Sequence, residues 1–236
     1  MRTARNRTRG FTLVELLVAL FAMALLALMS WRGLDGMVRA QAQTQARADG
    51  VLTLQVGLAQ WAADLDALVQ LPQTTAIAWD GSVLRMTRRS TASATDGVLV
   101  VGWSRRVVNG AGTWLRWQSP LVTTRGELDA AWQQAGIWSQ NPGAEQQLRE
   151  VAIGPLDDWQ IYFFRETAWT NPLSSDVKAA APAPAPAAGA PPGAVASAVA
   201  NIPDGVRLVL ALPPGQAISG TLTRDWIRPT VGGGKG

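Results

Sequence analysis

The chain has 236 residues and contains neither cysteine nor histidine. Its length suits one main domain, with a core large enough to fold without cross-links. The missing cysteine excludes disulfides and thiolate nucleophiles, and the missing histidine excludes a Ser-His-Asp triad and the usual zinc sites. No combination of Ser, Lys and an acid has a catalytic spacing. We therefore expect a protein that is not an enzyme and that holds no metal or other cofactor.

The basic excess of the chain is concentrated at its N-terminus. Residues 1–10, MRTARNRTRG, carry four arginines and no acid, and these arginines account for the whole difference between 21 basic and 17 acidic residues. A basic tag beside an apolar segment sets membrane topology, whereas nucleic-acid binding needs basic charge spread over a domain. We therefore expect no nucleic-acid partner and an N-terminus on the cytoplasmic side of a membrane.

A long apolar run follows Gly10. Residues 11–29, FTLVELLVALFAMALLALM, contain a single charge, Glu15. As a helix, this run measures about 28 Å, close to the thickness of a bilayer's hydrocarbon core. The following residues offer a poor signal-peptidase site, so the run is expected to remain as an anchor. A lone carboxylate in such a helix costs on the order of 3 kcal/mol, so Glu15 is unexpected in a plain anchor.

The string GFTLVE, from Gly10 to Glu15, resembles the prepilin-type processing motif of type IV pilins and type II secretion pseudopilins. The resemblance implies that a prepilin peptidase cuts between Gly10 and Phe11, removing residues 1–10, and that Phe11 is then N-methylated. It also implies that Glu15 is retained for assembly. In a filament of packed helices, the Glu15 carboxylate would meet the N-terminal amine of a neighbouring Phe11, so that neither charge stays unpaired.

The helix is expected to continue beyond the membrane. One helix over 12–70 is predicted, with 11–30 in the membrane or filament core, 31–71 as its continuation, and Pro72 blocking further extension. Apolar residues recur in its second half at spacings of three and four, which predicts packing on the chain's own sheet, with a short coiled-coil seam as the alternative. These residues are Val51, Leu54, Leu58, Trp61, Leu65 and Leu68.

From Pro72 to residue 229 the pattern becomes that of a β-rich head. Asp80-Gly81 and the segment 109–112 are predicted hairpin turns, and residues 127–135 a short helix. The predicted strands are 74–79, 82–89, 98–108, 114–118, 148–153, 159–165, 205–212 and 220–227. These elements predict an α+β, pilin-like fold, in which one long N-terminal helix packs on an antiparallel sheet.

Two further segments of the chain have no strand pattern. Residues 179–200 contain 12 Ala and 5 Pro and no charge, a composition typical of an extended loop that builds no core. We expect this segment to be a flexible loop within one domain. Residues 230–236, which are rich in glycine, are expected to form a flexible tail.

Tryptophan is abundant, and most of it is expected in the core. Six tryptophans in or beside strands are more typical of a β-core than of a sugar-binding platform: Trp79, Trp103, Trp114, Trp117, Trp159 and Trp169. Two others, Trp132 in the predicted short helix and Trp138 in the loop expected after it, are predicted to be exposed contacts for partner subunits.

The charged residues of the head suggest no site. A calcium site needs six to eight converging oxygens, and neither Asp64 with Asp66 nor Asp157-Asp158 provides them. These acids are expected to be solvated, as are the basic pairs Arg88-Arg89 and Arg105-Arg106 at strand edges.

Several strings also resemble the J-type minor pseudopilins of type II secretion. WRGLDGM follows the apolar run at 31–37, and WAADL lies at 61–65. Looser similarities are WLRW at 114–117, IPDGVRL at 202–208 and TRDWIRP at 223–229. The Ala/Pro-rich segment is atypical of that family.

The J-type resemblance implies a subunit at the tip of a periplasmic pseudopilus that helps to initiate assembly and protein export. The implied partners are the I-type and K-type minor pseudopilins, the major pseudopilin, the prepilin peptidase and the inner-membrane assembly platform. A W-type minor pilin of a type IV pilus, serving adhesion or motility, is the main alternative. The third alternative, a membrane-anchored periplasmic enzyme, lacks a catalytic constellation.

Overall fold

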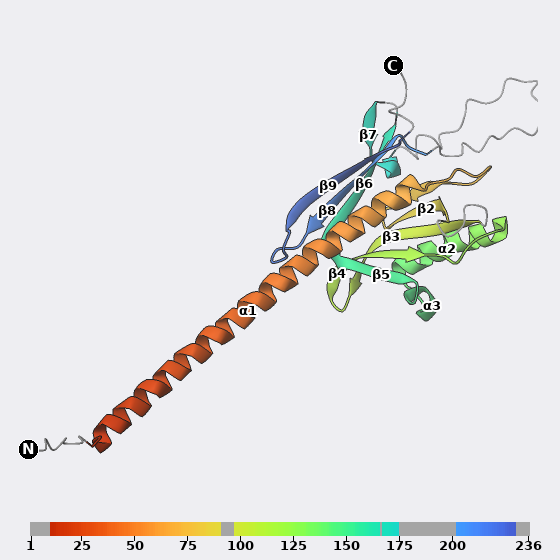
Figure 1. The fold of residues 1–236 in the computed structure, drawn as a ribbon. Coiled ribbons are helices and arrows are strands. Elements are labelled where there is room, and N and C mark those ends of the chain that lie inside the picture. Colours follow the sequence, from red (N-terminus) through yellow and green to blue (C-terminus); the bar gives the residue numbers. More distant parts are fainter. Residues whose placement is uncertain (1–9, 91–96, 166, 175–201, 230–236) are drawn as a thin grey trace, which may run out of the picture. The chain divides into compact units, whose positions relative to one another are not determined.

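The computed structural model describes residues 10–90, 97–165, 167–174 and 202–229 (Figure 1). A long N-terminal helix is followed by antiparallel sheets, which confirms the predicted α+β, pilin-like fold. The chain divides into two compact units, residues 1–49 and 50–236. The leader up to residue 9, the Ala/Pro-rich loop at 179–200 and the tail at 230–236 lie outside the described residues.

Helix α1 spans Leu13–Asp66 and therefore ends before the predicted limit at residue 70. The cause is pairing with a strand: Leu68 forms a β-bridge with Arg88, and the Val69 N–H donates to the Thr87 carbonyl. The chain therefore leaves the helix to extend the sheet before Pro72 is reached. Pro72 would block the helix, but the helix ends six residues before it, at Asp66.

The first sheet has the order β1-β2-β3-β4-β5, and every neighbouring pair is antiparallel. Its strands are β1 Ile77–Trp79, β2 Val83–Arg89, β3 Val98–Val108, β4 Ala111–Gln118 and β5 Glu150–Pro155. Both predicted hairpins are present. The second turn is shorter than predicted, because Asn109 and Gly110 alone take left-handed conformations, with φ of 51° and 81°, and Ala111 already pairs with Val108.

The second sheet has the order β7-β6-β8-β9 and is also antiparallel. Its strands are β6 Asp158–Arg165, β7 Ala168–Thr170, β8 Gly205–Leu212 and β9 Gly220–Ile227. The predicted bounds of β8 and β9 are confirmed. Strand β7 was not predicted, because three residues are too few to show an alternating pattern.

Helix α2, Arg125–Gln140, is longer than the predicted 127–135. Thr124 and Glu127 close a capping box that satisfies backbone donors at its start, and backbone hydrogen bonding ends with the Asn141 N–H on the Ile137 carbonyl. Trp138 therefore lies in the helix and not in a loop after it. A short helix α3, Ala144–Gln147, follows.

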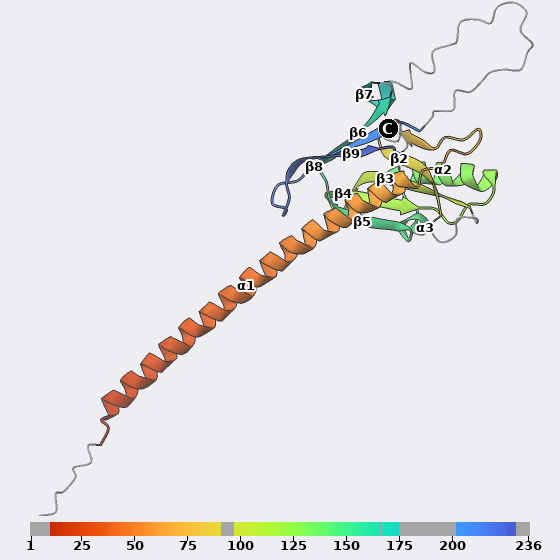
Figure 2. The ribbon, with the colours of Figure 1, turned by 45° about the horizontal axis from the view of Figure 1, so that its top comes forward.

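The sheets and helices of the head enclose two apolar cores. Residues 50–66 of α1 lie on one face of the β1–β5 sheet, and α2 covers the other face (Figures 1 and 2). The larger core lies between α1 and both sheets and includes Trp61, Leu65, Trp103, Trp159 and Trp226. The smaller core lies under α2.

The apolar stripe of α1, predicted from Val51 to Leu68, packs on the head from Leu54 onward, whereas Val51 is only partly buried and does not belong to the core. Trp61 and Leu65 are fully buried, and Leu54, Leu58 and Leu68 pack against the same core. The helix approaches strand β5 closely at Gly57, where an added Cβ would lie 2.2 Å from Ile153 Cγ2. The absence of a side chain at Gly57 therefore allows this helix to pack closely on its sheet.

Candidate functional site

The structure places Glu15 in a hydrogen-bonded turn with Thr12. The Glu15 Oε2 atom accepts from the Thr12 N–H at 3.0 Å and from the Thr12 hydroxyl at 2.9 Å. In return the Glu15 N–H donates to Thr12 Oγ1 at 3.3 Å. This is a capping box at the first turn of α1, and the T-x-x-E spacing at 12–15 would have revealed it in the sequence. Within one chain, Thr12 therefore binds the Glu15 carboxylate that is predicted to act in assembly.

The first part of α1 exposes its apolar side chains all round. Exposed large side chains occur from Phe11 and Leu13 through Leu25 to Val38. One 18-residue window has a mean hydropathy of 2.5 and none of it is buried, so the helix is long and apolar enough to cross a membrane. Phe11 itself is 85% exposed. An uncovered apolar segment of this length is compatible with a membrane anchor.

A buried ionic cluster binds the C-terminal end of α1 to the head. Asp64 is completely buried, and its carboxylate accepts from Arg116 Nε at 2.8 Å and Arg116 Nη2 at 2.9 Å. Arg88 Nη1 and the indole N–H of Trp103 donate to the same carboxylate. The expectation that Asp64 and Arg88 are solvated is therefore wrong. A buried carboxylate is tolerated here because charged and polar donors surround it.

Asp66 is also bound to the head, although on a different element. Its Oδ1 atom accepts from the indole N–H of Trp226, in β9, at 2.7 Å. A single turn of α1 therefore contacts both sheets: Asp64 binds residues of β2, β3 and β4, and Asp66 binds a residue of β9. Asp64 is therefore not a solvated residue, whereas Asp66 is exposed, as predicted, although it accepts this hydrogen bond. No group of three or more Asp and Glu side chains in the described ranges is placed to hold a metal ion.

Trp138 is fully buried, so the prediction that it is an exposed partner contact is wrong. Its indole N–H donates to Glu150 Oε2 at 2.7 Å, and Arg106 donates two hydrogen bonds to the same carboxylate at 2.7 and 2.9 Å. Arg106 is therefore not a solvated edge residue either. Its neighbour Arg105 donates from Nε to the Leu156 carbonyl at 2.9 Å.

Trp132 is only partly buried. Its indole N–H donates to Thr87 Oγ1 at 3.0 Å, and the Arg85 guanidinium lies 5.4 Å from its ring centre. A partner contact at Trp132 stays a prediction. Of the six tryptophans expected in the β-core, all are buried except Trp169, which lies partly exposed in β7 under the guanidinium of Arg207 at 4.3 Å.

The strings that suggested a J-type protein contact one another in the head. Asp64, in WAADL, binds Arg116, in WLRW. Arg207, in IPDGVRL, donates twice to Asp225, in TRDWIRP, at 2.7 Å for each bond. Residues far apart in sequence are thus joined by specific polar contacts, which sequence reasoning had treated as separate similarities.

Comparison with known families identifies the N-terminal segment. The family described as the prokaryotic N-terminal methylation motif matches residues 5–31, which include Gly10, Phe11, Glu15 and most of the exposed apolar part of α1. The match supports a pilin-like or pseudopilin-like protein. None of the curated proteins compared with this chain matches it. The head, residues 72–229, lies outside the matched segment.

Proposed function

We propose that this chain is a J-type minor pseudopilin, a subunit at the tip of the pseudopilus of a type II secretion system. The prepilin-type methylation motif at 5–31 carries the proposal. It supports a structural protein rather than an enzyme, one that is made as a precursor and anchored through α1. The proposal includes cleavage between Gly10 and Phe11, N-methylation of Phe11, and a bacterial inner-membrane location with the head in the periplasm.

The head supports the narrower, J-type assignment through its sequence similarities. The strings WAADL and WLRW supply Asp64 and Arg116 to the buried cluster that binds α1 to the head. A buried aspartate in the first string therefore needs the arginine of the second string as its partner. In this role the chain would join I-type and K-type minor pseudopilins, with the major pseudopilin below them. The prepilin peptidase and the inner-membrane assembly platform would act on it before assembly.

A W-type minor pilin shares the motif and the long helix, so the test must separate two machines. We would delete the gene cleanly and score secreted protein in the culture supernatant and twitching motility in the same strain. Loss of secretion with motility intact, restored by the full chain in trans, is the expected result. Loss of twitching with secretion intact would assign the protein to a surface pilus, and loss of neither would contradict both roles.

A further inference from the structure

The two sheets of the head have four edge strands in the described part of the chain, and three of them are protected against pairing with another chain. Strands β1 and β7 have only three residues each. Strand β5 has a register shift opposite Trp114 and Leu115 and ends at Pro155, which has no N–H to donate. Short strands, bulges and prolines are common means by which proteins keep sheet edges from pairing. The fourth edge strand, β9, has none of these features within its bounds.

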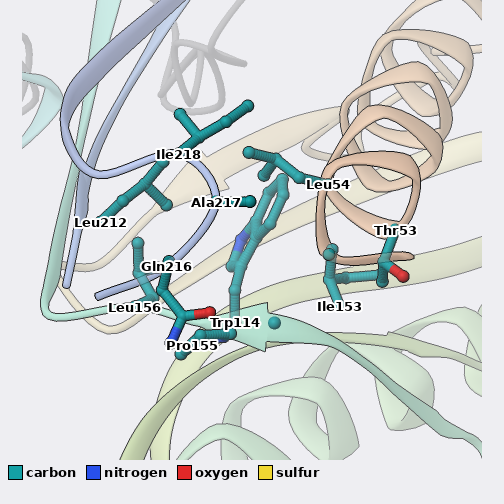
Figure 3. A pocket seen from close by; sticks show the side chains of 12 residues that line it. Thr53, Leu54, Trp114, Ile153, Pro155, Leu156, Leu212, Gln216, Ala217 and Ile218 are labelled. Carbon is teal, nitrogen blue, oxygen red and sulfur yellow. The ribbon is translucent and has the colours of Figure 1, made fainter. Parts of the chain in front are cut away.

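Strand β9 is therefore an open edge of full length. It pairs with β8 over eight residues, Gly220–Ile227, and no strand of the described ranges pairs with its other side. Figure 1 shows β9, in dark blue, along the outer side of its sheet. The loop that precedes β9 bends toward α1 rather than along this edge, because Ala217 and Ile218 line a pocket together with Leu54 (Figure 3).

The register of β9 shows which of its backbone groups face the open edge. The Arg228 N–H donates to the Asp204 carbonyl at 2.8 Å across the β8–β9 pair. Hydrogen-bonded and non-hydrogen-bonded pairs alternate along an antiparallel ladder, so Arg224 and the other even-numbered residues bond to β8. The N–H and C=O groups of Thr223, Asp225 and the other odd-numbered residues therefore face outward. Such an edge has the chemistry to bind an extended peptide strand.

The charges on β9 determine which strand fits. Leu222 and Trp226 belong to the larger core, and Arg224 lies between them on the same side of the strand, where it is exposed. Within the described residues, no hydrogen bond or ion pair engages its guanidinium. The neighbouring charge, Asp225, is already paired with Arg207. Arg224 is therefore the uncompensated charge of this edge, and it favours a carboxylate on the strand opposite.

The segments that precede β8 and follow β9 in the sequence lack this carboxylate, and so does the β9 of a second copy. Residues 179–200 contain no charge and five prolines, and residues 230–236 contain no acid. In a symmetric pair of copies, directly opposed residues lie on one face, and the face of β9 that carries Arg224 has no acid. Charge complementarity therefore favours a strand from a different protein.

We propose that β9 pairs with an antiparallel, extended strand of a different protein, and that this strand places an Asp or Glu opposite Arg224. Because the Arg224 backbone bonds to β8, the acid opposite it lies in a non-hydrogen-bonded pair, where side chains approach most closely. Apolar residues two positions before and after the acid lie opposite Leu222 and Trp226. The backbone bonds provide affinity, and the contact with Arg224 provides selectivity. The proposal goes beyond the proposed function and does not depend on it.

The test uses the full chain in detergent and two fluorescently labelled peptides that alternate as the proposed strand does. The first peptide, TVTDTVT, has a valine two positions from the acid on each side, and the second, TVTKTVT, replaces the acid with lysine. Fluorescence anisotropy should show saturable binding of the acidic peptide, about five times tighter than that of the basic peptide, as expected for one cross-strand charge pair. Arg224→Glu should reverse this order of affinity. Detergent without protein is the control for both peptides.

Two further changes test the backbone bonds. Thr223→Pro removes an N–H that faces the open edge, which an edge strand tolerates, and it should abolish binding of the acidic peptide without lowering the melting temperature. The matched variant Thr223→Val keeps this N–H and should bind as the original chain does. Methylation of the acidic peptide at the amide nitrogens of its third and fifth residues, which face β9, should abolish binding to the original chain. This last measurement gives the same test if Thr223→Pro fails to fold.

Three results would overturn the proposal. The first is the absence of saturable binding of the acidic peptide, and the second is equal affinity for both peptides in the original chain and in Arg224→Glu. The third is a dimer of the full chain that Thr223→Pro dissociates, as measured by light scattering, because it would assign the edge to a second copy. None of these results predicts the phenotype of the gene deletion, so failure here is distinguishable from failure of the proposed function.

Discussion

Arg116 in β4 donates two hydrogen bonds to Asp64 in α1, from Nε at 2.8 Å and from Nη2 at 2.9 Å, although the two residues lie 52 positions apart in the sequence. The paired geometry of guanidinium and carboxylate fixes orientation as well as distance. Because Arg88 and Trp103 donate to the same carboxylate, one side chain of the helix is held by β2, β3 and β4 together. This cluster sets the rotation of α1 on its sheet.

Removing the Asp64 carboxylate should destabilise the head strongly. Asp64→Ala leaves two arginines, with side chains only 6% and 12% exposed, without their acceptor. Breaking a buried pair in this way costs about 3–5 kcal/mol. Thermal unfolding of the full chain in detergent, followed by near-ultraviolet circular dichroism, should show a melting temperature lower by roughly 2–4 °C for each of those kcal/mol.

The matched control for Asp64 is another aspartate that pairs with an arginine, but at the surface. Asp225 binds Arg207 with both side chains about one-third exposed. Exposed pairs contribute about 0–1 kcal/mol, so Asp225→Ala should change the melting temperature little. Equal losses in the two variants would show that the Asp64 cluster does not fasten the helix.

Gly57→Ala should destabilise the head even though alanine favours helices. The added Cβ would lie 2.2 Å from Ile153 Cγ2, and overpacking of this kind costs about 1–3 kcal/mol. Removing the opposing atoms with Ile153→Ala should make the Gly57→Ala change harmless, as a double-mutant cycle would measure. Gly50→Ala, which meets nothing within 4 Å, should be neutral or stabilising by up to about 1 kcal/mol. A harmless Gly57→Ala in the otherwise unchanged chain would contradict the close approach of α1 and β5.

Asp80 should hold the β1–β2 turn in a pH-dependent way. Its Oδ1 atom accepts from the N–H groups of Ser82 and Val83, both at 2.9 Å. Burial raises the pKa of Asp80, but these hydrogen bonds and the nearby Arg85 guanidinium outweigh it, so the pKa lies below its ordinary value of 3.8. A depressed pKa gives stability that is present above the unfolded-state value, about pH 4, and is lost as the pH falls through the folded-state value.

Two substitutions distinguish the hydrogen bonds that Asp80 accepts in the turn from the effect of its charge. Asp80→Ala removes the acceptor and should cost about 1–2 kcal/mol at neutral pH, whereas Asp80→Asn keeps an acceptor oxygen and should cost less. The free energy of unfolding, measured between pH 7 and pH 2, should decrease less below pH 4 in both variants than in the original chain. An identical pH profile in all three proteins would exclude Asp80 as a source of acid sensitivity.

Processing should remove the leader. Coexpression with a prepilin peptidase should give a protein lacking residues 1–10 and carrying one added methyl group on Phe11, as read by intact mass and by sequencing of the N-terminal peptide. The chain expressed without the peptidase is the control. A product that still begins at Met1 in the presence of an active peptidase would contradict the pilin-like interpretation of the N-terminus.

Glu15 has two possible roles, and two substitutions distinguish them. Glu15→Ala removes both the charge and the capping box with Thr12, whereas Glu15→Gln removes the charge and keeps an acceptor for the Thr12 N–H. If the carboxylate pairs with the amine of a neighbouring Phe11, both variants should be cleaved normally and both should assemble poorly, as measured by sheared or crosslinked filaments. Normal assembly of Glu15→Gln would assign the role of Glu15 to the helix cap.

The sequence was sufficient for most of the elements, although it missed β7 and α3, but it was not sufficient for the contacts between the elements. Alternating apolar residues predicted β8 and β9 within their actual bounds, because one face of each strand is buried. The end of α1 was misplaced because the bridge between Leu68 and Arg88 competes with the helix, and such a bridge depends on a strand more than 15 residues away. Local signals such as Pro72 carry no information about that competition.

The charged and aromatic residues show the same limit. Asp64 was expected in solvent because an isolated aspartate is normally exposed, and its burial becomes favourable only once Arg88 and Arg116 converge on it. Trp138 was misplaced because the predicted helix stopped too early, which moved a buried ring into a loop. The T-x-x-E pattern at Thr12, by contrast, was a local signal that the sequence did contain.

The bond from Trp226 to Asp66 joins residues 160 apart, and it lies at the end of the last strand. A ribosome completes α1 and the β1–β5 sheet long before β9 exists, so the larger core stays open on one side until β9 has been made. A nascent head therefore exposes core side chains such as Trp61 and Trp103 until β8 and β9 have been made, which is a hazard for aggregation. Because β9 supplies Trp226 to the larger core, chains truncated before residue 220 should be degraded by proteases faster than the full chain.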